Sequence, residues 1–292
     1  MRGDEELRRK KEVLDYIRFV CPMLLLYTIF FLVPLGQTVM CSFTSWNGIS
    51  PDKEFIGFAN YLSAWKDPVF HSSMRFTAAS AILFMIAANG LGFLLALCLN
   101  RKIRTRIALR AIIFCPFIFN NVTVGFIWQF LLSRLMTDLY PATGWGIFNM
   151  GWLSDEKLVL YSVVFVKLWQ SVGYFMVIYL AGLQMLPQDP LEAAVIDGCG
   201  RLKMIPYIKL PLMKSTIFVC LFLAVTETLN MYPLLMTLTN GGPGHASENI
   251  SLYIYTEAFK SHNMGYASAL AVILTIAVML VAAVQMKLTK EE

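Results

Sequence analysis

Hydrophobic residues gather in six long runs along the chain, and polar or charged segments separate these runs. Each run is about as long as the roughly 20 apolar residues that an α-helix needs to cross the hydrocarbon core of a bilayer. We expect spanning helices near residues 17–40, 76–98, 109–132, 158–183, 214–238 and 265–287. The pattern therefore predicts an all-α membrane protein with about six transmembrane helices.

The composition agrees with a membrane protein. Of the 292 residues, 57% are hydrophobic and 15% are charged, and the mean hydropathy is +0.61, whereas soluble domains carry about 25% charged residues. The first run follows Arg8-Arg9-Lys10-Lys11, as a secretory signal would, but its apolar stretch is longer than a signal core and lacks a small-residue cleavage site. We expect it to be retained as the first span.

Lys and Arg residues are distributed unevenly between the polar segments. With the N-terminus inside, 17 of them fall in cytoplasmic segments and six in external ones. Because cytoplasmic loops carry the excess of Lys and Arg, both termini and the loop 184–213 are expected in the cytoplasm. The formal net charge of +5 then describes topology and requires no nucleic-acid partner. The expected organisation is a basic cytoplasmic segment at 1–16, a transmembrane domain at 17–287 and a cytoplasmic tail at 288–292.

Motifs that carry catalytic chemistry are absent from the sequence. The six cysteines form no C-x-x-C pair and the three histidines lie far apart, so we expect no metal site. There is no G-x-x-x-x-G-K-[ST] phosphate loop, no H-E-x-x-H and no nucleophile elbow. We therefore expect no catalytic residue, no cofactor in this chain and no enzymatic activity.

A short charged stretch with two glycines, residues 192–211, interrupts the apolar chain between the fourth and fifth runs. Asp189 is placed to cap a helix that has Pro190 in its first position and a glutamate three residues after the cap. Gly198 and Gly200 would end this helix, and Pro206 would open or kink a second one. The pattern predicts two short helices with an apolar stripe, which suits either docking in a partner's groove or a linker on the membrane surface.

This stretch resembles a known motif. Glu192-Ala193-Ala194-x-x-Asp197-Gly198, followed by Ile208-x-Leu210-Pro211, is similar to the EAA loop of permease subunits of binding-protein-dependent ATP-binding-cassette importers. External segments resemble the maltose-type, carbohydrate branch of that family. These segments are 55–61 with 67–70, and 239–244 with 253–255. The resemblance runs from about residue 20 to the C-terminus.

The resemblance implies a type I importer permease fold and a transport subunit that passes a saccharide to the cytoplasm of a bacterium or archaeon, across its plasma (inner) membrane. It implies as partners a homologous second permease, a dimer of ATPase subunits that bind ATP and Mg, and an extracytoplasmic solute-binding protein. In this family the EAA segment, here within 187–213, holds a coupling helix that docks in a cleft of the ATPase. The coupling residues so implied are Glu192, Ala193, Ala194, Asp197, Gly198, Cys199 and Ile205. The chain departs from the family pattern at Cys199, Ile205 and Lys214.

Few polar residues interrupt the predicted spans. Lys167, Ser171 and Tyr174 are spaced i, i+4, i+7 and share a helical face, and a charge at mid-bilayer costs upward of about 2.5 kcal/mol. Lys167 and Glu227 therefore either pair with each other or act in transport. The resemblance implies a substrate path formed by Asn121, Lys167, Ser171, Tyr174, Glu227 and Thr228. A cation at Lys167 suggests an acidic substrate, such as a uronate-containing oligosaccharide.

A second class of function is a self-sufficient secondary transporter in which Glu227 is a proton-coupling carboxylate. Against it, the six runs contain no inverted repeat that we detect, and only one carboxylate lies well inside a span. A membrane enzyme would need a paired acid, a nucleophile or a metal constellation, which the sequence lacks.

Overall fold

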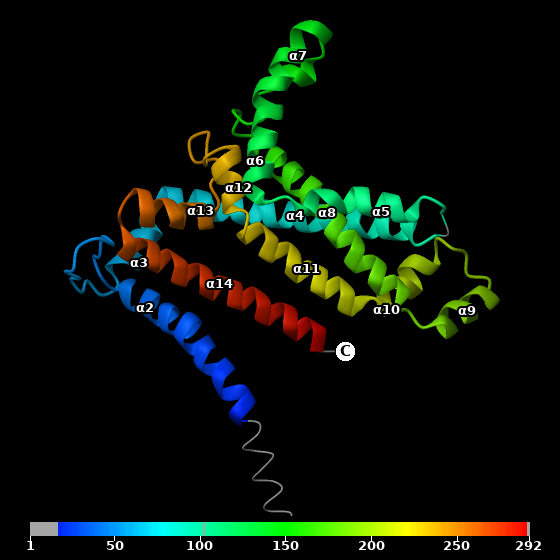
Figure 1. Cartoon of the computed structure of the whole chain (residues 1–292), viewed down its shortest axis with the longest axis horizontal. Coiled ribbons are helices and arrows are strands. Elements are labelled where there is room, and N and C mark those ends of the chain that lie inside the picture. Colours follow the sequence, from blue (N-terminus) through cyan, green and yellow to red (C-terminus); the bar gives the residue numbers. More distant parts are fainter. Residues whose placement is uncertain (1–16, 102, 291–292) are drawn as a thin grey trace, which may run out of the picture. The chain divides into compact units, whose positions relative to one another are not determined.

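The chain folds as an assembly of helices, seen in a computed structural model that describes residues 17–101 and 103–290 (Figure 1). Four helices among these residues are long and apolar enough to cross a membrane. They are Ile17–Cys41, Pro68–Leu99, Val159–Gln184 and Met264–Lys287. The number rises to six if each of two bent pairs is counted as one span. These pairs are Arg106–Ile118 with Asn121–Thr143, bent by 95°, and Ile205–Leu212 with Lys214–Leu229, bent by 73°. The prediction of an all-α membrane protein with about six spans is confirmed, whereas the predicted segment 1–16 lies outside the described residues.

The helices belong to two compact units, which we describe separately. The first unit contains the described residues up to Lys66 together with Ile254–Thr275. Its elements are the helix Ile17–Cys41, which ends in α2 (Val33–Cys41), the short helix α3 (Ala59–Lys66), a π-helical turn (Thr256–Lys260) and the beginning of α14 (Met264–Lys290).

Asn60 organises the loop that follows the first helix. Its side-chain amide donates to the backbone carbonyls of Ser42 and Thr44, at 2.8 and 2.9 Å, and the hydroxyl of Tyr61 lies 2.7 Å from that of Ser42. A β-bridge pairs Thr44 with Phe55 in the same loop. The resemblance at residues 55–61 thus corresponds to residues that hold this loop against the end of α2.

The second unit contains Asp67–Tyr253 and the rest of α14. Its helices are α4 (Pro68–Leu99), α5 (Arg106–Phe114), α6 (Asn121–Phe130), α7 (Met136–Thr143), α8 (Val159–Gln184), α9 (Gln188–Ile196), α10 (Leu210–Leu212), α11 (Lys214–Leu229) and α12 (Tyr232–Leu238), followed by α13 (Ile250–Tyr255), whose end enters the first unit. Short 3-10 or π-helical pieces connect some of them, at Cys115–Ile118, Leu131–Leu135, Gly146–Asn149 and Ile205–Lys209.

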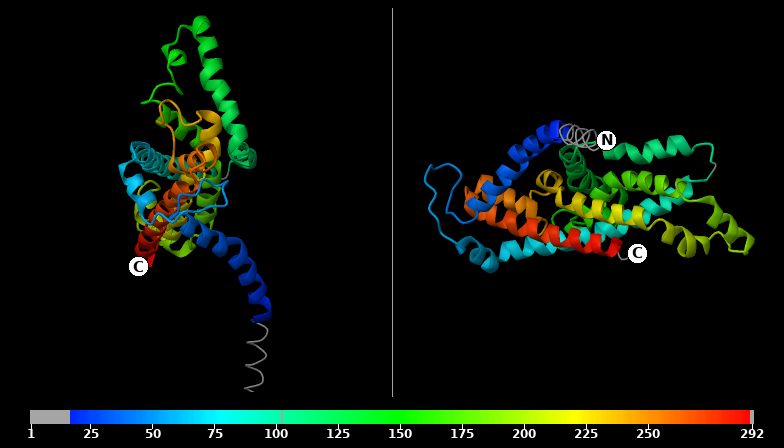
Figure 2. Two further views of the ribbon diagram at one scale, coloured as in Figure 1. Left: turned by 90° about the vertical axis from the view of Figure 1, so that its left-hand side faces the viewer. Right: turned by 90° about the horizontal axis from the view of Figure 1, so that it is seen from below.

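The core of this unit lies between α4 and α8, which run beside each other in both figures (Figures 1 and 2). A Cβ added at Gly92 of α4 would lie 2.7 Å from the Cβ of Phe175 on α8, so the two helices approach closely at this glycine. Asn89 accepts a hydrogen bond of 2.6 Å from the Tyr179 hydroxyl across the same contact. Small residues at helix contacts are the usual means by which spanning helices pack in lipid.

Two of the predicted spans are interrupted, although the apolar runs 109–132 and 214–238 continue through the breaks. In the third run the chain is extended at Phe119, and Asn120 caps α6 by accepting a 2.9 Å hydrogen bond from the Val122 amide. In the fifth run α11 ends at Leu229 and α12 begins at Tyr232. The prediction of continuous helices was wrong here, because hydropathy measures how apolar a segment is and not how its backbone hydrogen bonds are satisfied.

Candidate functional site

An ion pair joins two of the spans of the second unit. Lys167 lies on α8 and Glu227 on α11, and the Lys167 Nζ lies 2.6 Å from the Glu227 Oε2. The lysine side chain is 3% exposed and the glutamate side chain 26% exposed. Because a lone charge is costly inside a bilayer, mutual neutralisation explains how both residues are tolerated. The pairing that the sequence analysis left open as one possibility is present in the structure.

Side-chain amides surround this ion pair. The Lys167 Nζ lies 3.4 Å from Oε1 of Gln170 and 3.5 Å from Oδ1 of Asn121, distances that are long for hydrogen bonds. Gln170 donates a 2.9 Å hydrogen bond to the carbonyl of Phe119, and Nδ2 of Asn121 lies 3.5 Å from the carbonyl of Asn230. These carbonyls belong to the breaks in the third and fifth runs. The polar cluster of Asn121, Lys167, Gln170, Glu227 and Asn230 therefore lies where two helices are interrupted.

Three of the six residues predicted for the substrate path belong to this cluster, and three do not. Ser171 is fully buried, and its Oγ has no hydrogen-bond partner among the described residues. The Tyr174 ring stacks on Phe117, with centroids 4.4 Å apart and planes 2° from parallel. Thr228 is buried and donates a 3.0 Å hydrogen bond to a carbonyl of its own helix.

Gln170 and Asn230 are cluster residues that the sequence analysis did not assign to the path. Gln170 follows Lys167 by three residues and so lies on its face of α8, which is a signal present in the sequence. The position of Asn230 depends on the end of α11 at Leu229, which hydropathy did not reveal. No group of three or more His, Cys, Asp and Glu residues able to hold a metal ion occurs within 17–101 and 103–290.

The ion pair changes the electrostatic argument about the substrate. The expectation of an acidic saccharide depended on an uncompensated cation at Lys167, but Glu227 neutralises that cation within the same chain. The carboxylate is also the more exposed member of the pair. The structure therefore removes the basis on which an acidic saccharide was expected.

The segment predicted to couple to an ATPase forms α9, a tight turn and the bent helix Ile205–Leu212. Gly198 follows α9 with a φ of +74°, the Gly198 amide donates to the Val195 carbonyl, and the Cys199 amide donates to the Ala194 carbonyl. This pair of bonds is the Schellman arrangement that ends a helix with a left-handed residue. The predicted helix, turn and helix are confirmed. A Cβ added at Gly198 would meet nothing within 4 Å, so glycine is required there for its left-handed φ and not for lack of space.

Two details of this segment differ from the sequence-based prediction. The helix begins at Gln188, one residue before the expected cap Asp189, and no side chain caps it. Pro190 is accepted in the first turn because amides there have no partner within the helix. The apolar stripe predicted for this segment does not lie on one face, because Ala194 is buried whereas Val195 is exposed.

Large apolar side chains of this segment point outward. Ile196 is 85% exposed, Leu202 83% and Tyr207 76%. The residues predicted for coupling have the following burial: Glu192, Ala193, Asp197 and Gly198 are exposed, Cys199 and Ile205 are partly exposed, and Ala194 is buried. Exposed apolar residues on a capped, ordered element are typical of a surface that another protein covers.

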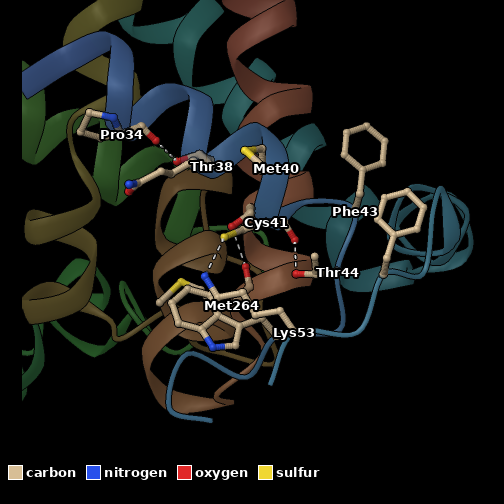
Figure 3. Close-up of a pocket in the computed structure, with 12 residues that line it drawn as sticks. Pro34, Thr38, Met40, Cys41, Phe43, Thr44, Lys53 and Met264 are labelled. Carbon is tan, nitrogen blue, oxygen red and sulfur yellow. Dashed lines mark hydrogen bonds between the residues drawn. The ribbon is translucent and has the colours of Figure 1, made fainter. Parts of the chain in front are cut away.

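A cavity of about 770 Å³ lies in the first unit (Figure 3). It is lined by the end of α2, the following loop and the start of α14, with Pro34, Cys41 and Met264 among its walls. The Lys53 Nζ lies 3.8 Å from the centroid of the Trp46 ring. Because the walls are mainly apolar and the lysine already contacts an aromatic face of the same chain, we do not assign the substrate path to this cavity.

Comparison with known proteins identifies relatives over nearly the whole chain. The family described as "Binding-protein-dependent transport system inner membrane component" matches residues 88–289. The probable ABC transporter permease protein YurN of Bacillus subtilis is 31% identical over 286 residues, which cover 96% of this chain and 97% of the relative. The probable starch degradation products transport system permease protein AmyD of Thermoanaerobacterium thermosulfurigenes is 33% identical over 276 residues, with 94% of each protein covered.

Solved structures share the fold. A chain of a bacterial ABC transporter involved in the import of the acidic polysaccharide alginate superposes with a TM-score of 0.81, covering 100% of this chain and 99% of that chain. The sequence identity is 19%. At this identity the likeness concerns the arrangement of the helices alone.

Proposed function

Because the chain belongs to the family of binding-protein-dependent transport system inner membrane components, we propose that it is the permease subunit of an importer that passes a saccharide to the cytoplasm. The relative AmyD is named for starch degradation products, and the relative MsmF of Streptococcus mutans, 30% identical over 273 residues, for multiple sugars. Both names support a saccharide as the substrate class.

The observation that carries this proposal is the polar cluster at the two helix breaks. Amide groups and a carboxylate are the partners that sugar hydroxyls need, and interrupted helices form binding sites in other transporters. Asn121, Lys167 and Glu227 form this part of the path. Ser171, Tyr174 and Thr228 support the neighbouring helices.

The energy for transport comes from partner subunits. An ATPase dimer binds ATP and Mg and docks on the apolar surface of α9 and the helix Ile205–Leu212, while this chain itself catalyses no reaction. A homologous second permease completes the pathway, and an extracytoplasmic binding protein delivers the saccharide. The outward-pointing Ile196, Leu202 and Tyr207 support this assignment of the docking surface.

The distribution of Lys and Arg supports an orientation in which the chain crosses the plasma membrane of a bacterium or archaeon with both termini in the cytoplasm. A test uses two variants that contain one cysteine each. The first keeps only the native Cys199 on the coupling segment, and the second has its one cysteine introduced by Lys157→Cys on the predicted external side. A membrane-impermeant maleimide added to intact cells should label the Lys157→Cys variant only, and inverted vesicles should show the opposite. Labelling of Cys199 from outside would contradict the orientation.

A secondary transporter is disfavoured because Glu227 already pairs with Lys167 and is therefore not a lone proton-coupling carboxylate. The deciding experiment purifies the tagged chain with its partners from its native membrane and reconstitutes the complex in liposomes with a panel of labelled saccharides. We expect an ATPase and a second permease to co-purify, and uptake to require ATP and to survive an uncoupler. Uptake by the chain alone, driven by a proton gradient, would overturn the proposal.

A further inference from the structure

The ion pair is asymmetric, and the asymmetry bears on the charge of the substrate. We propose that Glu227 is a specificity-determining residue, which favours uncharged saccharides and disfavours anionic ones, and this inference rests on the function proposed above. Lys167 positions the Glu227 carboxylate, whose exposed part is what the transported molecule meets.

The acceptors around the Lys167 ammonium group all belong to this chain. An ammonium group has three N–H donors, and the Lys167 Nζ has three acceptors around it, Oε2 of Glu227, Oε1 of Gln170 and Oδ1 of Asn121. Its side chain is 97% buried, since 3% is exposed. A carboxylate on the substrate would have to displace one of these partners before it could contact the lysine.

Glu227 has the opposite character. Its side chain is 26% exposed, and Lys167 is its only polar partner in the part of the chain that the structure describes. That contact uses Oε2, so the Oε1 atom keeps its capacity to accept a hydrogen bond. A sugar hydroxyl can donate to this oxygen, whereas a second carboxylate cannot and is repelled by it.

The surroundings of Glu227 add hydrogen-bonding capacity without adding positive charge. Asn120 and Asn230 are exposed at the two helix breaks, and Asn121 is partly exposed. Amide groups donate to and accept from hydroxyls. The other Lys and Arg residues within the apolar runs lie within two residues of a run's end, at Arg18, Arg110, Lys214 and Lys287. Around Glu227 this chain thus offers partners for the hydroxyl groups of a substrate, and the adjacent cation, Lys167, is already paired.

The test compares two probes that differ only in charge. The reconstituted complex is given whichever neutral oligosaccharide of the labelled panel it imports, and separately the same oligosaccharide with its C6 hydroxyls oxidised to carboxylates. We expect the native complex to import the neutral probe at least tenfold faster than the uronate probe. Glu227→Gln should reduce this ratio to about threefold or less, because the amide carries no charge and Lys167 then lacks its counter-ion. The Lys167→Met/Glu227→Gln double variant should behave in the same way.

Thr226→Val is the matched control on the neighbouring position of α11, where the hydroxyl bonds only to a carbonyl of its own helix. It should leave the ratio at the native value. A native complex that imports the uronate probe as fast as the neutral one, or a ratio that Glu227→Gln does not change, would overturn the inference while saccharide import stands. ATP-dependent import of no saccharide, neutral or acidic, would instead overturn the proposed function, and this inference with it.

Discussion

Tyr253 on α13 donates a hydrogen bond to Asp67, with 2.5 Å between the Tyr253 Oη and the Asp67 Oδ2. The other carboxylate oxygen of Asp67 accepts a 2.8 Å hydrogen bond from the Val69 amide and caps the first turn of α4. One carboxylate thus connects two segments that are 186 residues apart in the sequence. Both segments carry the resemblance to the carbohydrate branch, so the motif at each position has a structural explanation.

Replacing Asp67 by alanine should destabilise the protein, because it weakens the first turn of α4. The substitution removes an N-cap, which is worth about 1 kcal/mol, and a hydrogen bond to a charged group, which is worth about 1.5–3 kcal/mol. Asp67→Asn keeps a capping oxygen and should lose less, and Tyr253→Phe should lose only the hydroxyl contact. The measurement is the thermal unfolding midpoint in detergent. Equal midpoints for Asp67→Ala and Asp67→Asn would show that the cap is unimportant.

The stability of the protein should suffer when one member of the ion pair of Lys167 and Glu227 is removed without the other. Removing one partner of a buried pair leaves an uncompensated charge, at a cost of about 3 kcal/mol, the lower end of the range because Glu227 is partly exposed. Lys167→Met should therefore lower the unfolding midpoint and the amount of protein in the membrane. Adding Glu227→Gln to Lys167→Met should restore part of both. If the loss of stability in the double variant equals the sum of the losses in the two single variants, the two residues do not interact.

The spans were predictable from the sequence because a long apolar run has few alternatives to a membrane helix. The break at Phe119 was not, since its stability comes from a residue far along the chain. Gln170 donates to the carbonyl that the break leaves without a helical partner. Asn120 was a local signal, because asparagine is a preferred N-cap, but it stood inside an apolar run and was counted as part of one helix.

The candidate site was predictable only in part from the sequence. Mid-span charges identified Lys167 and Glu227, and helical periodicity correctly placed Lys167, Ser171 and Tyr174 on α8. Periodicity gives the face of a helix but not its partner, and Tyr174 stacks on Phe117 rather than joining the cluster. Thr228 follows Glu227 directly, and adjacent residues on a helix do not share a face. Thr228 is buried and bonds to its own helix instead of joining the cluster.

The contact between α4 and α8 should be sensitive to one added methyl group. Gly92→Ala would place a Cβ 2.7 Å from the Cβ of Phe175 and 3.3 Å from the Met176 amide nitrogen, which forces the helices apart. Overpacking of this kind costs about 1–3 kcal/mol. Gly90→Ala is the matched control on the same helix, where nothing lies within 4 Å of the added atom. The unfolding midpoint should fall for the first variant only, and equal midpoints would show that this close approach of the helices contributes little to stability.

Gly198→Leu should uncouple ATP hydrolysis from transport while leaving the protein in the membrane. A leucine at a φ of +74° is strained, at a cost of about 1–2 kcal/mol for a left-handed residue, so the turn after α9 would change its path. Because the docking surface proposed for the ATPase includes this turn, the two helices would no longer present their apolar residues together. The measurement is the number of saccharide molecules imported per ATP hydrolysed by the reconstituted complex, which we expect to fall at least tenfold.

Gly200→Leu is the control that separates backbone strain from the bulk of the new side chain. Gly200 also lies in open space, with nothing within 4 Å of an added Cβ, but its φ is not in the left-handed region. The same leucine there should leave the coupling ratio within about threefold of the native value, and the abundance of both variants should match the native protein. If both leucines lower the ratio equally, bulk at the surface is the cause. If Gly198→Leu imports saccharide normally at normal abundance, the proposed role of this turn in coupling is wrong.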